Sequence, residues 1–97
     1  MSYGINVTYQ VKPGRRREFL DALEAAGIQK AVLDEAGCIR YDYFLPVSEA
    51  DQVLLVEQWE NKEAQQVHLT QPHMDRIKEI KERRVDGTAL VCYDLPD

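Results

Sequence analysis

Residues 52–60 (QVLLVEQWE) constrain the fold most strongly, because they have the pattern of a strand that is apolar on both faces. The apolar side chains divide between the two faces, with Val53, Leu55 and Trp59 on one and Leu54 and Val56 on the other. A strand of this kind needs cover on both sides of its sheet. A chain of 97 residues has room for only one modest core. The pattern of the other segments must therefore show what covers each of the two faces of this strand.

The rest of the chain divides into segments with the period of a strand or of a helix. Residues 3–11 alternate between apolar and polar side chains, as a strand with one buried face does. Further strands are predicted at residues 38–45 and 88–95, and helices at residues 15–35, 62–69 and 74–84. In the strand at 38–45, the residues expected on one face are Ile39, Tyr41, Tyr43 and Leu45. The resulting order of elements is β-α-β-β-α-β.

Single residues mark where these elements begin, bend or end. Gly27 is the candidate position for a bend in the helix at 15–35, and Gly37 is a natural stop after that helix because glycine takes the left-handed conformation cheaply. Asn61 is expected to cap the helix at 62–69. Pro72 should separate that helix from the next one.

This order predicts an α+β, ferredoxin-like βαββαβ domain that spans residues 1–97, with an antiparallel four-stranded sheet and helices on one face. Because the helices cover only one face, we expect a second copy of the chain to cover the other, which gives a homodimer through the sheets. The second and fourth strands should lie at opposite edges. Cys38 and Cys92 would then be too far apart to form a disulfide bond.

The charge balance and the apolar runs exclude two classes of partner. Twelve Lys and Arg residues against seventeen Asp and Glu residues give a net charge of −5, which would repel a nucleic acid backbone. The wholly apolar runs are short, and the first residues lack the basic and apolar regions of a signal peptide. We therefore expect a cytoplasmic protein with neither a nucleic acid nor a membrane as partner.

The usual signatures of cofactor and metal sites are missing. There is no G-x-G-x-x-G, G-x-x-x-x-G-K-[ST], C-x-x-C or H-E-x-x-H pattern, so we expect no cofactor and no metal. His68 and His73 lie five residues apart, and an uninterrupted helix would separate them by about 140°. The interpretation favoured for this pair is one packed and one surface histidine, rather than two ligands of one metal ion.

The cluster of Glu57, Trp59 and His68 is the most informative candidate site. Ala64 and His68 are four residues apart and Val67 lies beside them, which predicts that His68 faces the sheet. With an unperturbed pKa of ~6.5, its imidazole could accept a proton from a phenolic ligand. The alternative is a core histidine that bonds to a backbone carbonyl or to Glu57.

Polar and aromatic residues of the strands leave further alternatives open. Asn6 stands in the middle of a predicted strand, where it is either an amide that faces a ligand or an edge residue in water. Tyrosines occupy five predicted strand positions, at Tyr3, Tyr9, Tyr41, Tyr43 and Tyr93. They suit either a packed sheet or a pocket that stacks on a ring.

Three motifs together resemble the antibiotic biosynthesis monooxygenase family over roughly residues 5–95. They are residues 57–64 (EQWENKEA) with His68 and His73, residues 37–41 (GCIRY), and residues 11–14 (VKPG). The chain is most similar to the quinol monooxygenase branch. The resemblance implies a dimeric α+β barrel that oxidises a hydroquinone or polyphenol with O2 to a quinone, with no metal or flavin. The deprotonated substrate supplies the electrons.

The resemblance also implies roles for individual residues. His68 would be the base or would stabilise the anion, Trp59 and Tyr41 would form an aromatic slot, and Asn6 would orient an oxygen atom. Glu57 and His73 would contact the substrate, with His73 at the rim.

Two features depart from the family pattern, and other functions stay open. Ala36 stands where relatives often carry Glu, and Gly27 interrupts a helix that is usually continuous. The family also includes haem-degrading enzymes that use an Asn, a Trp and a His, which Asn6, Trp59 and His68 could supply, and an isomerase or degrader of a phosphorylated signalling sugar. A dimeric module that binds a small ligand without catalysis is a further alternative, since a fold alone does not fix a function.

Overall fold

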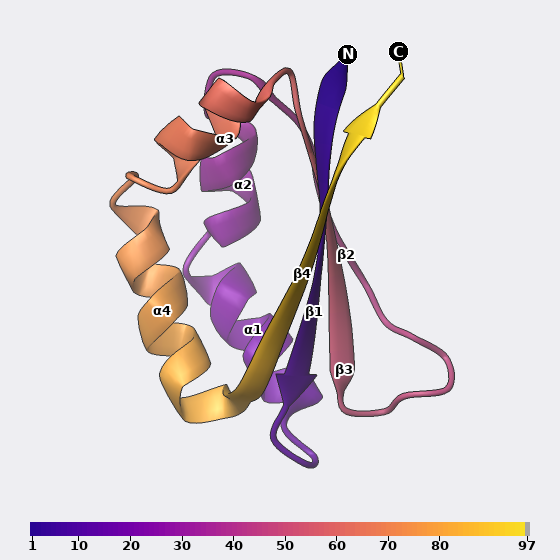
Figure 1. Ribbon diagram of the computed structural model, residues 1–97. Coiled ribbons are helices and arrows are strands. Elements are labelled where there is room, and N and C mark those ends of the chain that lie inside the picture. Colours follow the sequence, from indigo (N-terminus) through magenta and orange to yellow (C-terminus); the bar gives the residue numbers. More distant parts are fainter. Residues whose placement is uncertain (97) are drawn as a thin grey trace.

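The computed structural model describes residues 1–96, which form one sheet with four helices packed on one of its faces (Figure 1). The elements in chain order are β1 (Ser2–Val11), α1 (Arg16–Ala25), α2 (Ile28–Leu33), β2 (Cys38–Phe44), β3 (Gln52–Trp59), α3 (Lys62–His68), α4 (His73–Arg84) and β4 (Val85–Leu95). None of the helices in the described part of the chain has the length and apolar character needed to cross a lipid bilayer.

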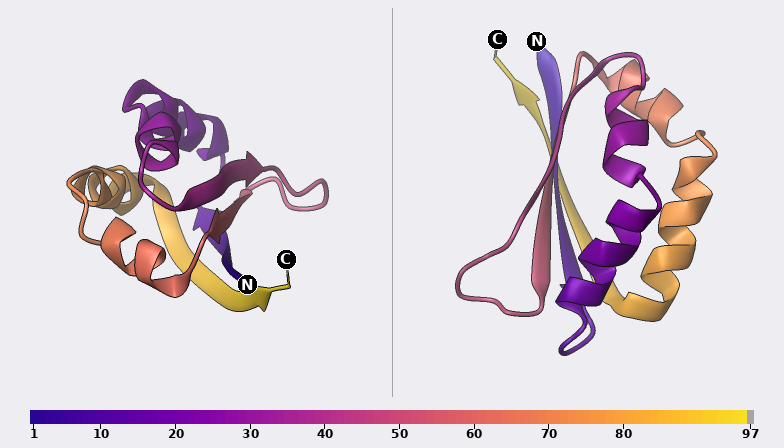
Figure 2. Two further views of the ribbon diagram at one scale, coloured as in Figure 1. Left: turned by 90° about the horizontal axis from the view of Figure 1, so that it is seen from above. Right: turned by 180° about the vertical axis from the view of Figure 1, so that it is seen from behind.

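The sheet has the strand order β2-β3-β1-β4, and every neighbouring pair is antiparallel. This confirms the predicted ferredoxin-like α+β fold and the placing of the second and fourth strands at opposite edges. Cys38 on β2 and Cys92 on β4 are accordingly free thiols. The two further views show that all four helices lie on the same side of the sheet and leave its other face open (Figure 2).

The core fills the space between the sheet and the helices. Alternate residues of β1 and β3 are buried on this side, among them Ile5, Val7, Val53, Leu55 and Trp59. The intervening Leu54 and Val56 of β3 point to the open face and are half-buried. The two-sided apolar pattern predicted for this strand is therefore present, with one face covered by helices.

The predicted helix at residues 15–35 is wrong as a single element, because Gly27 divides it into α1 and α2. Gly27 has a φ of 65°, in the left-handed region that an α-helix cannot continue through. β4 also begins earlier than predicted, at Val85, where it follows α4 directly. The apolar side chain of Val85 packs against the core, which explains why the strand starts before Gly87.

One face of β2 also differs from the prediction, because the strand contains a bulge. Cys38 pairs with Trp59 and Arg40 pairs with Gln58, so Ile39 is the extra residue, and it is 50% exposed. Cys38 packs against the core in its place. Leu45 lies beyond the end of the strand and is exposed, whereas Tyr41 and Tyr43 share one face, as predicted, and that face packs against the core.

The turn between α2 and β2 packs closely against α3. Gly37 in this turn has a φ of 84°, and a Cβ atom built on it would lie 2.7 Å from Cβ of Ala64. The backbone N–H of Glu60 also donates a hydrogen bond to the carbonyl of Gly37, at 2.8 Å. Glycine is therefore needed here both for its backbone conformation and for the close approach of the two segments.

We expect Gly37→Ala to destabilise the fold by more than Gly14→Ala does. Gly14 also has a positive φ, of 76°, but its Cβ position is open, so its replacement carries only the backbone cost of about 1–2 kcal/mol. The overlap with Ala64 adds about 1–3 kcal/mol at Gly37. Urea unfolding of both variants measures the difference, and adding Ala64→Gly should recover part of the loss. Equal midpoints for the two alanine variants would contradict the contact.

Candidate functional site

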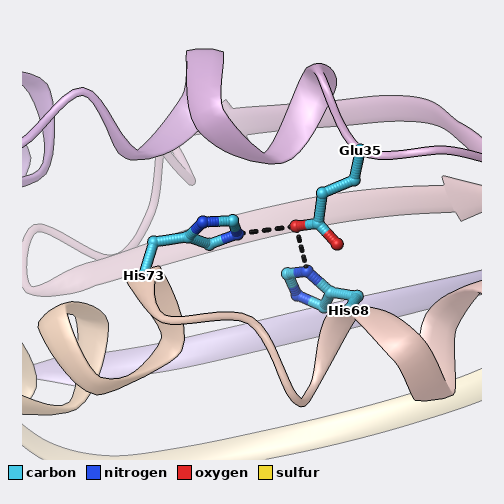
Figure 3. A group of neighbouring side chains, drawn as sticks. All are labelled: Glu35, His68 and His73. Atoms are coloured by element: carbon cyan, nitrogen blue, oxygen red, sulfur yellow. Dashed lines mark hydrogen bonds and ion pairs between the residues drawn. The ribbon is translucent and has the colours of Figure 1, made fainter.

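A carboxylate and two imidazoles meet between the helices and the sheet (Figure 3). Oε2 of Glu35 lies 2.7 Å from Nδ1 of His68 and 2.6 Å from Nε2 of His73. Glu35 comes from the turn between α2 and β2, His68 ends α3, and His73 begins α4. The side chains of Glu35 and His68 are 9% and 3% exposed, and that of His73 is 19% exposed. We call these three side chains the Glu35 cluster.

The two histidines converge because α3 is short and the chain turns sharply after it. The side chain of Asn61 accepts a hydrogen bond from the N–H of Ala64 and caps α3, as predicted. After His68 the chain turns, and Pro72 precedes the first residue of α4. The angle of 140° expected for a continuous helix does not apply: His68 is buried, and His73 is half-buried with a hydrogen bond to the same carboxylate.

The prediction that His68 faces the sheet is confirmed, although one reason given for it is wrong. The buried residues of α3 are Gln65 and His68. Val67 is 59% exposed and points away from the core. The helix therefore turns a largely polar face inward, and His68 is held there by hydrogen bonding to Glu35 as well as by packing.

Glu35 fixes the proton on His68. An ionised carboxylate only accepts hydrogen bonds, so the ring nitrogen that faces it carries the hydrogen. Nδ1 of His68 is therefore a donor, and in the neutral ring Nε2 has the free lone pair. Within residues 1–96, Nε2 takes part in no hydrogen bond. This is the arrangement of an imidazole base that is oriented by a carboxylate.

Aromatic rings surround the imidazole of His68. The centroid of the Trp59 ring lies 4.7 Å from that of His68, with an angle of 36° between the planes. The ring of Tyr41 meets it edge-on at 6.2 Å. Trp59 and Tyr41 are buried, so the two predicted slot residues do lie beside the predicted base.

Glu57 orients Trp59 and does not bond to His68. Its Oε1 accepts a hydrogen bond of 3.0 Å from Nε1 of the indole. Burial raises the pKa of Glu57, and the Trp59 N–H and His68 act in the opposite direction. The alternative in which Glu57 or a backbone carbonyl holds His68 is therefore wrong, because Glu35 does so.

Sequence reasoning missed Glu35. It considered Ala36 as the position of the family's glutamate, whereas the carboxylate that the structure uses is one residue earlier. The available signal was an acidic residue two positions before the glycine of a predicted turn. Only the packing of that turn against α3 shows which imidazoles it reaches.

The structure places Asn6 away from the other predicted site residues. Asn6 pairs with Val56 and Val91 on the open face of the sheet, opposite to the face that carries His68. Its Oδ1 accepts a hydrogen bond of 2.7 Å from the hydroxyl of Tyr93. Asn6 also lies on a central strand, so it is not an edge residue in water.

A groove of about 370 Å³ opens between α1, α2 and β2. Its lining includes Leu20, Leu23, Ile28, Gln29 and Tyr43. Tyr43 meets Tyr41 edge-on at 5.8 Å, and Tyr41 in turn contacts His68. Burial raises the pKa of Tyr43 to about 12, so its hydroxyl stays protonated at neutral pH. Two tyrosine rings therefore connect the groove with the Glu35 cluster.

We expect Glu35→Ala to destabilise the protein by about 1–3 kcal/mol or more, because it leaves two largely buried imidazole N–H groups without their acceptor. Asp34→Ala is the matched control. It removes the neighbouring carboxylate, whose ion pair with Lys30 is exposed, and should cost less than about 1 kcal/mol. Chemical unfolding monitored by circular dichroism compares the two, and similar losses would argue against a structural role for the Glu35 cluster.

Comparison with known proteins identifies the family. The family model described as antibiotic biosynthesis monooxygenase matches residues 2–80. No curated protein matches this chain. Among solved structures, a conserved protein from Methanosarcina mazei Go1 is 21% identical, with 96% of this chain and 91% of that chain covered and a TM-score of 0.85.

Two further solved structures have the same fold. A protein from Bacteroides thetaiotaomicron VPI-5482, described as a possible oxidoreductase, is 24% identical, with 97% of each chain covered and a TM-score of 0.84. One described as an antibiotic biosynthesis monooxygenase is 17% identical, with 98% of this chain and 99% of that chain covered and a TM-score of 0.83. At these identities the structures show a common fold, and the match over residues 2–80 shows that this chain belongs to the antibiotic biosynthesis monooxygenase family.

Proposed function

We propose that this protein is a cofactor-independent monooxygenase that oxidises a small electron-rich aromatic, a hydroquinone or a polyphenol, with O2 to a quinone. The observation that carries the proposal is the buried imidazole of His68, which has its Nδ1 bound to Glu35 and its ring against Trp59. Membership of the family supports the reaction class. The hydroquinone or polyphenol is the more specific part of the proposal.

The first step is removal of a phenolic proton by Nε2 of His68. The imidazolium that forms is stabilised by the carboxylate of Glu35, which already accepts the hydrogen on Nδ1. The aromatic rings of Trp59 and Tyr41 exclude water from this position, which strengthens the attraction between the two charges. The protein therefore supplies the proton transfer, and the electrons come from the substrate.

The second step is oxidation of the phenolate by O2. One electron passes from the anion to O2, and the two radicals combine to form a C–O bond in a hydroperoxide. Cleavage of the O–O bond then leaves one oxygen atom in the quinone and releases the other as water. One hydroquinone and one O2 thus give one hydroxylated quinone and one water. The atoms and electrons balance, so no external reductant is needed.

The groove beside Tyr43 is the proposed entrance for the substrate. Its volume of about 370 Å³ lies within the range of small-molecule pockets, and its wall combines aliphatic side chains and Tyr43 with the polar Glu24, Gln29 and Lys30. Tyr41 and Tyr43 stand between the groove and His68, so these rings must move for a phenolic oxygen to reach Nε2. In this scheme His73 acts through Glu35, and Asn6 takes no part in the chemistry.

The haem-degrading alternative has less support from the geometry. It needs an Asn, a Trp and a His in one pocket, and Asn6 lies on the sheet face opposite to Trp59 and His68. A haem titration tests it, since a shifted Soret band at stoichiometric protein would favour that alternative. The phosphorylated-sugar alternative would need an anion site at the Glu35 cluster, where the carboxylate would oppose it.

We also propose that the open face of the sheet joins two copies of the chain. Apolar side chains lie on this face at Leu54 and Val56 of β3, Phe44 of β2 and Val91 of β4, with Asn6 and Thr8 of the central strand β1 between them. A second sheet would cover these side chains and form the α+β barrel expected from the sequence. The cytoplasmic location and the lack of a nucleic acid partner stay predictions.

Oxygen uptake with a panel of hydroquinones tests the proposed reaction. We expect His68→Ala to lower kcat by about 10²-fold to 10⁴-fold, which is the usual contribution of a general base. Glu35→Gln should lower kcat by at least about tenfold with little change in KM, because Gln can bond to the ring but cannot stabilise its charge. Glu63→Gln, an exposed change on α3, is the control.

Two outcomes would contradict the proposed reaction. Equal rates for the wild type and His68→Ala would remove His68 from the mechanism. Oxygen uptake no faster than in the absence of protein, across the whole panel, would favour the module that binds a ligand without catalysis.

Light scattering after size exclusion tests the proposed dimer. The wild type should have about twice the chain mass of 11.2 kDa, and Val56→Arg should have the mass of one chain, because it places a charge in the middle of the open face. Val67→Arg adds the same charge at an exposed position on α3 and should leave the dimer intact. A wild-type protein that elutes as a monomer at micromolar concentration would contradict the proposal.

A further inference from the structure

The Glu35 cluster has the composition of a metal site. We propose that Glu35, His68 and His73 bind one divalent transition-metal ion of the Zn²⁺ class, through one oxygen and two nitrogen atoms. The three ligand atoms all lie within 4.8 Å of one another. Two imidazoles and one carboxylate form the protein ligand set of several zinc enzymes, in which further positions stay open for water or another ligand.

The spacing of the ligand atoms requires only a small adjustment. Zinc binds nitrogen and oxygen at about 2.0–2.2 Å, so two ligand atoms of a tetrahedral shell lie roughly 3.3–3.6 Å apart. Oε2 of Glu35 is now 2.7 Å and 2.6 Å from the two nitrogen atoms. Rotation of the carboxylate away from the rings by about 1 Å would create the space for an ion, and the two imidazole nitrogen atoms, which lie within 4.8 Å of each other, would also have to approach.

Metal binding also does not require the two neutral imidazoles to lose a proton overall. In the metal-free protein Nδ1 of His68 and Nε2 of His73 donate hydrogen bonds to Glu35. A metal ion takes the position of both hydrogens if each ring shifts its proton to its other nitrogen. The cation then replaces the two N–H groups as the partner of the carboxylate, so Glu35 stays paired.

The ligand types select among ions. Imidazole nitrogen suits Zn²⁺, Co²⁺, Ni²⁺ and Cu²⁺, whereas Mg²⁺ and Ca²⁺ prefer a shell of oxygen atoms. Glu35 and His68 are almost fully buried, and His73 is the most exposed of the three. An ion would therefore enter past His73 and lose most of its water, which favours a strongly bound transition metal over a weakly held surface ion.

Metal binding would switch off the proposed base. This second part of the inference rests on the proposed function. When Nδ1 of His68 ligates the ion, the ring proton is on Nε2, which then has no lone pair to accept a phenolic proton. The metal-free form would be the active monooxygenase, and the metal-bound form would be inactive. The imidazole of His68 cannot accept the phenolic proton and ligate the metal ion at the same time, so the two states exclude each other.

Binding is measured without reference to activity. Equilibrium dialysis of the chelator-treated protein against Zn²⁺ should give one equivalent per chain, and Co²⁺ should produce the visible absorption bands of a low-symmetry site. Glu35→Gln and His73→Gln should each weaken Zn²⁺ binding by about 10-fold to 100-fold or more, since each removes a ligand. Glu63→Gln is the matched control and should bind as the wild type does. Circular dichroism shows whether each variant is folded.

Binding that is absent in the wild type, or equal in the folded Glu35→Gln, His73→Gln and Glu63→Gln proteins, would overturn the proposed site. A second, partially conservative variant, His73→Asn, keeps the test valid if His73→Gln does not fold.

The proposed inhibition is tested separately in the oxygen-uptake assay. Zn²⁺ should abolish uptake by the chelator-treated wild type, at the concentrations at which dialysis shows binding, and a chelator should restore it. Binding without inhibition would overturn the switch and leave the site in place. Uptake that requires added metal would support the site and overturn the cofactor-independent reaction, so the two proposals fail in distinguishable ways.

Discussion

One oxygen atom of Glu35 accepts hydrogen bonds from imidazoles that end one helix and begin the next, and the arrangement of the site depends on it. The carboxylate is delivered by a turn that can approach α3 because Gly37 has no side chain to meet Ala64. The need for glycine at position 37 therefore determines where the carboxylate of Glu35 lies relative to the two imidazoles. Without this approach, His68 would be a buried imidazole with no charged partner.

The side chains of β3 alternate between the two faces of the sheet, and the helices cover only one of these faces. One face of β3 carries Leu55, Glu57 and Trp59 toward the helices, and the other carries Leu54 and Val56 toward the proposed partner. Asn6 shares the second face, where the hydroxyl of Tyr93 satisfies its oxygen and the ring of Tyr93 covers Gly4. An amide that looks catalytic in the sequence thus belongs to the packing of the open face, because neighbouring strand residues point in opposite directions.

The fold was largely predictable from the sequence, and the site only in part. Period-two patterns identified the strands, and the doubly apolar 52–60 segment required a sheet with two covered faces. The contact between Trp59 and His68 was predictable because Trp59 ends a strand and His68 lies on the helix that follows it. The pairing of Glu35 with both histidines was not predictable, because it depends on a turn that meets α3 from 33 residues away in the sequence. The bulge at Ile39 and the break between α1 and α2 at Gly27 were not predictable for a similar reason. Each depends on local backbone geometry that periodicity does not encode.

The two buried carboxylates near His68 have different tasks because they have different partners. Glu57 bonds to the indole of Trp59, and burial raises its pKa, so its contribution is to hold the ring that forms one wall. Glu35 instead faces two nitrogen atoms, which together with its own oxygen form the proposed metal site. A carboxylate between two imidazoles stabilises positive charge whether that charge is an imidazolium or a bound cation. The geometry that supports His68 as the proposed base therefore also supports it as the proposed ligand, and the metal available to the protein would decide between the two roles.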